Sequence, residues 1–93
     1  MTAKQVRVVI SGRVQGVGFR YWTGDQAERH GLDGWVRNRR DGTVEAVFAG
    51  EAAVVDDMVA ACATGPRFAR VEDVAVAPDE EPVTPGFRYL PTV

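Results

Sequence analysis

The sequence predicts an α+β fold, a ferredoxin-like sandwich in which two helices cover one face of an antiparallel sheet. Short runs with apolar residues at every second position indicate strands, and two longer stretches with apolar residues three and four apart indicate helices. Their order is β-α-β-β-α-β, with room for a short fifth strand near the C-terminus. Because 93 residues suffice for one domain and are too few for two, we expect residues 1–93 to form a single domain.

A strand and a helix joined by a glycine-rich loop begin the chain. The β-branched run Val6–Ile10 predicts the strand, and Gly12–Gly18 predicts the loop. One apolar face along Phe19–His30 predicts a helix of about three turns, which Gly31 would end. Gly24 lies inside this helix, where glycine costs about 1 kcal/mol relative to alanine.

A hairpin is expected next. Leu32–Asn38 and Thr43–Phe48 alternate between apolar and polar residues, and Asp41-Gly42 between them is a turn signal. The alternation places Asn38 on one face of its strand and Arg37 on the other.

The second half of the chain holds the clearer of the two helices. Glu51–Ala63 has an apolar stripe and ends before Gly65-Pro66. Val71–Val76 predicts a strand, and the acidic, proline-rich Asp79–Pro85 predicts a loop. Phe87–Leu90 is then the short final strand.

Composition limits the classes of function. The formal net charge of −2 argues against a nucleic-acid partner, because nucleic-acid-binding domains usually carry a strong positive excess. The N-terminus shows no signal peptide, and no stretch approaches the ~20 apolar residues of a membrane span. A single cysteine allows no intrachain disulfide. We therefore expect a cytoplasmic protein that has no membrane contact and acts as a monomer.

The charges are distributed unevenly along the chain. Residues 1–40 carry eight basic and three acidic side chains, whereas residues 41–93 carry three basic and ten acidic ones. A basic half of this kind suggests an anionic partner.

The stretch Ser11–Arg20 is the first candidate site. Glycines between a strand and a helix let successive backbone N–H groups point inward, and a helix N-terminus adds further free N–H groups and a partial positive charge. Such a loop can hold an oxyanion, and phosphate is the one that we favour. The alternative is a simple strand–helix turn whose arginines are solvated.

The second candidate cluster, Gly34–Gly42, places a polar amide, Asn38, among the arginines Arg37, Arg39 and Arg40. It could equally be a charged hairpin tip in which Asn38 is a turn residue. The sequence leaves open whether this cluster lies near the first one.

Other chemistry has few candidates. One histidine and one cysteine, without acids at ligand spacing, make a poor metal site, so we expect no metal and no cofactor. His30 is expected at the exposed end of the first helix, and Cys62 and Met58 in the core.

Together the two clusters resemble a family. Gly12–Arg20 and Gly34–Asn38, the latter followed by Asp41-Gly42, are similar to the two signature motifs of the acylphosphatases. The resemblance extends to Gly65-Pro66 and Phe87, and so covers nearly the whole chain.

The resemblance implies a small enzyme that hydrolyses the carboxyl–phosphate anhydride of acyl phosphates without metal or cofactor, with inorganic phosphate as product and inhibitor. Arg20 would hold the substrate phosphate and Asn38 would orient the attacking water. The loop residues that would bind the phosphate through backbone N–H groups are Gln15, Gly16, Val17, Gly18 and Phe19. Arg13 would shape the loop or act as a secondary charge, and Arg37, Arg39 and Arg40 would attract substrate or simply be solvated.

The residues agree with this chemistry. A carboxylate is a good leaving group, and phosphoryl transfer is catalysed mainly by positioning and by charge stabilisation. A carboxamide does not ionise near neutrality, so Asn38 can orient water but cannot act as a base. The proton must then leave to solvent or to the substrate's own phosphate.

Two other functions remain open on the sequence. A non-catalytic accessory domain, binding carbamoyl or another acyl phosphate for a partner, would use the same loop, although a chain of 93 residues favours a free-standing enzyme. An RNA-binding module can share this element order, but Thr43–Phe48 lacks the basic-glycine-aromatic pattern that such modules use.

Overall fold

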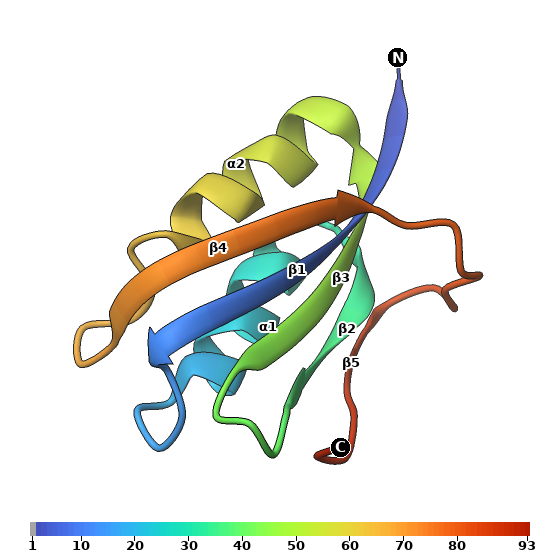
Figure 1. The fold of residues 1–93 in the computed structure, drawn as a ribbon. Helices are drawn as coiled ribbons and strands as arrows, with labels where there is room; N and C mark the ends of the chain where they lie inside the picture. Colours follow the sequence, from blue (N-terminus) through green and yellow to red (C-terminus); the bar gives the residue numbers. More distant parts are fainter. Residues whose placement is uncertain (1) are drawn as a thin grey trace.

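The computed structural model describes residues 2–93, and the elements follow one another in the predicted order with the fifth strand formed (Figure 1). Their bounds are β1 (Ala3–Arg13), α1 (Phe19–Arg29), β2 (Asp33–Asn38), β3 (Val44–Glu51), α2 (Ala52–Cys62), β4 (Arg70–Pro78) and β5 (Phe87–Tyr89). The strands β1 and β4 are longer than expected because they pair with each other beyond their apolar cores, as far as Arg13 and Arg70.

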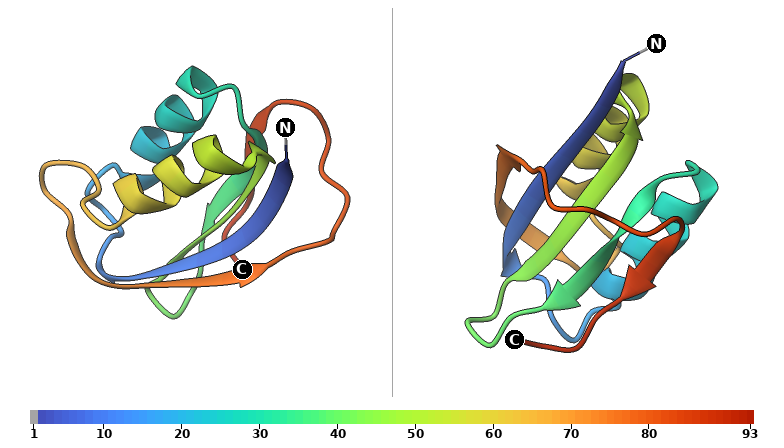
Figure 2. Two further views of the ribbon diagram at one scale, coloured as in Figure 1. Left: turned by 90° about the horizontal axis from the view of Figure 1, so that it is seen from above. Right: turned by 90° about the vertical axis from the view of Figure 1, so that its right-hand side faces the viewer.

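The strand order in the sheet is β4-β1-β3-β2-β5, and both helices cover the same face, as seen from above in Figure 2. The pairs among β1 to β4 are antiparallel, whereas β5 pairs with β2 in parallel. The predicted ferredoxin-like sandwich is therefore confirmed, with a mixed rather than purely antiparallel sheet. The parallel strand arises because the segment after β4 crosses to the opposite edge before it pairs (Figure 1).

The hydrophobic core lies between the sheet and the helices. Alternate residues of β1, β2 and β3 face it, and the two helices close it from the other side. Its fully buried members from the helices include Phe19, Ala27, Val55, Met58 and Cys62. Met58 and Cys62 are thus core residues, as the apolar stripe predicted.

The other face of the sheet carries a charged cluster. The Glu45 side chain is 2% exposed and forms ion pairs with Arg7 and Arg37, and the Arg37 Nε donates to Glu45 Oε1 at 2.7 Å. The Arg37 guanidinium also lies 4.6 Å from the centre of the Trp35 ring. These contacts therefore hold the Arg37 side chain on the face of the sheet opposite to the helices.

The interior glycine of α1 has a packing partner. A Cβ atom added to Gly24 would lie 1.9 Å from the Tyr89 hydroxyl oxygen, so the absence of a side chain at 24 makes room for the ring from β5. Tyr89 also contacts Tyr21, with ring centres 5.7 Å apart. The glycine in the helix and the tyrosine near the chain's end are two halves of one contact.

We expect Gly24→Ala to destabilise the protein by about 1 kcal/mol, although alanine is the better helix former, because the methyl group displaces the Tyr89 ring. In a Tyr89→Ala background the same change should instead stabilise by up to about 1 kcal/mol. Urea unfolding of the four proteins measures the coupling. An equal effect of Gly24→Ala in both backgrounds would show that residues 24 and 89 are not coupled.

Candidate functional site

A cavity of about 150 Å³ lies where the loop after β1 meets the end of β2. Its lining residues are Val14, Gln15, Gly16, Gly18, Phe19, Arg20, Tyr21 and Asn38. The fold thus brings together residues from both predicted clusters. Tyr21, which is 70% exposed, also lines the cavity, and the sequence reasoning missed it.

Alternating backbone geometry shapes the loop between β1 and α1. Gly16 and Gly18 have φ angles of 72° and 78°, in the left-handed region, while the residues between and beside them have negative φ. Nothing lies within 4 Å of a Cβ added to either glycine, so these positions need glycine for its backbone angle rather than for space. Alternation of this kind forms a nest whose N–H groups converge on an anion.

The backbone N–H groups of the loop are free to bind. Trp22 N donates to Gly18 O at 3.0 Å and closes the first turn of α1, but within residues 2–93 no N–H group from Gln15 to Tyr21 donates to a protein acceptor. The N-cap, Gly18, has no side chain to satisfy them. Such donors, together with the positive end of a helix dipole, are the features that bind anions in proteins.

Phe19 anchors this end of α1. Its side chain is 1% exposed, and its ring centre lies 5.4 Å from that of Trp22. Gly65, before β4, comes close enough that an added Cβ would lie 2.6 Å from the Phe19 ring. The buried ring fixes the helix start, and the next residue, Arg20, lines the cavity without an ion-pair partner among residues 2–93.

The Gln15 side chain connects the loop to the β2–β3 hairpin. Its Nε2 donates to the carbonyl oxygens of Arg39 at 2.6 Å and of Thr43 at 2.9 Å. Asn38 directly precedes Arg39, so this amide holds the end of β2 beside the loop. The sequence predicted a role for the Gln15 backbone only, and no local pattern predicts this contact of its side chain.

Asn38 occupies the last position of β2, on the face that the helices cover, as the alternation predicted. Val93 N donates to its carbonyl oxygen at 3.3 Å, and Arg40 N donates to the carbonyl oxygen of Val93 at 2.7 Å. The C-terminal residues thus hold the main chain around Asn38, while its side chain lines the cavity. Asn38 is therefore the last residue of a strand and lines the cavity, rather than a residue of the turn itself.

Other residues of the two motifs have side chains outside the lining of this cavity. Val17 and Arg13 line a second cavity on the far side of the loop. Arg39 lies 3.7 Å from the Asp41 carboxylate at the hairpin turn, and Arg37 is on the opposite face of the sheet. These arginines therefore do not form one substrate-attracting group.

Few of the described side chains could act as a general acid or base or bind a metal ion. Burial raises the pKa of the Cys62 thiol to about 12, which leaves it protonated near neutrality. His30 is exposed at the C-terminal end of α1, where its ring nitrogen bonds to Gln26 O. Among residues 2–93 there is no cluster of three histidine, cysteine, aspartate or glutamate side chains that could hold a metal ion. In the same residues, no helix is long and apolar enough to cross a membrane.

Comparison with known proteins identifies close relatives. A family model described as Acylphosphatase matches residues 6–89. An acylphosphatase of Nitrobacter hamburgensis is 60% identical over an alignment 93 positions long, which covers 94% of each chain. An acylphosphatase of Rhodospirillum rubrum is 52% identical over 97% of this chain and 99% of its own. The crystal structure of acylphosphatase from Bacillus subtilis superimposes with a TM-score of 0.88 at 36% identity, over 96% of this chain and 99% of that one.

We expect Gln15→Met, which keeps the size of the side chain but removes both donors, to lower the free energy of unfolding by about 1–2 kcal/mol. Gln26→Met on α1 is the control, because the Gln26 side chain makes no hydrogen bond within the described residues. It should change stability by less than about 0.5 kcal/mol. Chemical denaturation compares the two, and equal losses would show that the Gln15 link contributes nothing.

Proposed function

Because the chain belongs to the acylphosphatase family, we propose that the cavity between the loop and Asn38 is where it hydrolyses acyl phosphates to a carboxylate and inorganic phosphate. One observation carries the assignment of residues: Arg20, the free N–H groups of the loop and the Asn38 amide all line one cavity. The first two of these features suit a phosphate, and the amide suits a water molecule.

The loop and Arg20 bind the transferring phosphoryl group in this proposal. Backbone N–H groups of residues 15–19 and the planar guanidinium of Arg20 donate to the equatorial phosphate oxygens. In the transition state negative charge is spread over these oxygens, so fixed donors aimed at them stabilise it and lower the barrier. Within residues 2–93 the Arg20 side chain has no carboxylate to leave before it can bind substrate.

Asn38 orients the nucleophile. Its side-chain oxygen accepts a hydrogen bond from the water molecule that attacks phosphorus, in line with the leaving carboxylate. An amide cannot take up the proton, which passes to solvent or to a phosphate oxygen of the substrate. The acyl oxygen leaves as a carboxylate and needs no proton, so the site requires no general acid.

The alternative functions are less well supported. The relatives at 52% and 60% identity are acylphosphatases, which does not favour a non-catalytic accessory domain. We retain as predictions a single domain over residues 1–93, a monomer, a cytoplasmic location and no nucleic-acid partner. Independence from metal ions is also proposed, and turnover should be unchanged by a chelator.

We expect Arg20→Lys to lower kcat/KM for acetyl phosphate by at least about 10²-fold, because a point charge cannot replace a planar two-donor fork. Inhibition by inorganic phosphate should weaken in parallel. The control is Arg29→Lys, which changes an exposed pair with Asp25 at the other end of α1 and should leave turnover within about 2-fold. Near-wild-type turnover of Arg20→Lys would remove Arg20 from the site.

Asn38→Ala should separate the two roles. We expect a loss in kcat of about 10²-fold, while the inhibition constant of inorganic phosphate changes by less than about 3-fold, since the phosphate donors remain. Steady-state kinetics with and without phosphate give both quantities. If phosphate binding fell as far as turnover did, Asn38 would be a phosphate ligand or a structural residue and not the one that orients water.

A further inference from the structure

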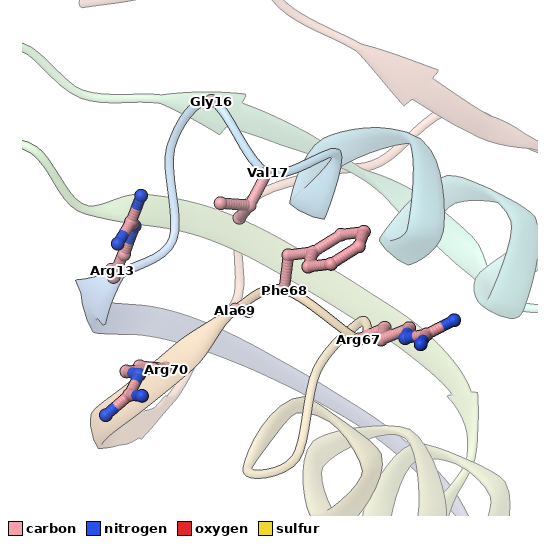
Figure 3. A pocket seen from close by; sticks show the side chains of 7 residues that line it. All are labelled: Arg13, Gly16, Val17, Arg67, Phe68, Ala69 and Arg70. Carbon is pink, nitrogen blue, oxygen red and sulfur yellow. The ribbon is translucent and has the colours of Figure 1, made fainter.

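A second and larger cavity lies on the other side of the phosphate-binding loop. It has a volume of about 600 Å³, and Figure 3 shows the residues that line it. They are Arg13, Gly16 and Val17 from the end of β1 and the loop, and Arg67, Phe68, Ala69 and Arg70 from the segment that leads into β4. Gly16 lines both cavities, so the two cavities adjoin at this residue.

The three arginines of this cavity have no acidic partners. None of Arg13, Arg67 and Arg70 forms an ion pair with another residue in the described part of the chain. In contrast, Arg7, Arg29, Arg37 and Arg39 all do. The cavity lining itself contains no acidic side chain, although the second half of the chain is rich in acids. The cavity therefore has uncompensated positive charge.

Two of these arginines lie side by side on neighbouring strands. Arg13 and Arg70 are register partners of β1 and β4, so their side chains leave the ladder on the same face, at one end of the cavity (Figure 3). Like charges directly opposite one another in a sheet destabilise it. An anion bound in the cavity would lower this repulsion.

Phe68 gives the cavity an apolar surface. Its side chain is 72% exposed, which is unusual for a large aromatic residue, and the Arg67 guanidinium lies 5.6 Å from its ring centre. Figure 3 shows the ring between Arg67 and Val17. The cavity thus combines a flat apolar surface with three cations.

We propose that this cavity binds the acyl group of the substrate, and that it favours acyl phosphates whose acyl part is aromatic or flat and carries a second anionic group, a carboxylate or a phosphate. The inference rests on the proposed function: with the phosphoryl group in the smaller cavity, the acyl group crosses Gly16 and lies on Phe68. Its distal anionic group then lies among the arginines of the cavity lining, Arg67 and Arg70 included. The hydrolysis itself is unchanged, and the cavity acts on the choice of substrate.

Three substrates of matched shape test the proposal: benzoyl phosphate, 4-carboxybenzoyl phosphate and 4-phosphonobenzoyl phosphate. The readout is the ratio of kcat/KM for each anionic substrate to that for benzoyl phosphate. The variant is Arg67→Gln combined with Arg70→Gln. The control is Arg29→Gln combined with Arg88→Gln, which removes the same charge from sites outside the cavity lining.

The Arg67 and Arg70 variant should lower this ratio by about 5- to 10-fold, mainly through KM, since each exposed arginine–anion contact is worth about 2- to 5-fold. The control pair should leave the ratio within about 2-fold. Raising NaCl to about 0.5 M should lower the wild-type ratio, because salt screens exposed charges. A larger effect on the phosphonate than on the carboxylate would identify phosphate as the preferred group, and the reverse would identify carboxylate.

A ratio that is the same in wild type and in the Arg67 and Arg70 variant would overturn the proposal, provided that benzoyl phosphate is hydrolysed. A wild-type protein that hydrolyses none of the three would instead contradict the proposed function itself. Phe68→Ala gives a further check that does not depend on charge. We expect it to lower kcat/KM for benzoyl phosphate relative to acetyl phosphate by about 5-fold or more, and an unchanged ratio would show that the acyl ring does not lie on Phe68.

Discussion

The site depends on one side-chain link between two distant parts of the chain. The loop after β1 supplies N–H donors, and the end of β2 supplies Asn38, but neither has a covalent reason to lie beside the other. The Gln15 amide joins them by donating to two carbonyl oxygens of the hairpin, those of Arg39 and Thr43. Because Asn38 is the residue before Arg39, the link fixes the amide relative to the loop. Positioning is the main catalytic means available to a site without ionisable bases, so small displacements there matter.

The hydrophobic core and the C-terminal residues keep the loop and Asn38 in these positions. The Phe19 ring fixes the start of α1 in the core, and glycines at 16 and 18 set the backbone angles that direct the N–H groups inward. From the other side, β5 and the residues after it hold β2, with Val93 bonded to the main chain around Asn38. Rigid elements therefore hold both halves of the site, although the phosphate donors themselves belong to a loop.

The sequence predicted the elements, and residues of both predicted clusters line one cavity, because strands, helices and the loop depend on local patterns. Alternation placed Asn38 and Arg37 on opposite faces of β2, and glycine spacing located the loop. Long-range relations could not be predicted. The contact between Gly24 and Tyr89, the Gln15 link and the pairing of Arg7 with Glu45 each join residues that come together only when the sheet is assembled. For the same reason, no local pattern predicted that Arg67 and Arg70, which belong to the acidic half of the chain, line the same cavity as Arg13.

The central claim is that free N–H groups of the loop bind phosphate opposite Asn38. The most direct measurement is a titration of the isotopically labelled protein with inorganic phosphate, followed by the NMR shifts of its amide groups. If the loop binds phosphate, we expect saturable shifts that are largest for the backbone amides of Gly16, Gly18 and Arg20 and that include the side-chain amide of Asn38. Saturable binding that leaves these loop amides unshifted would contradict it.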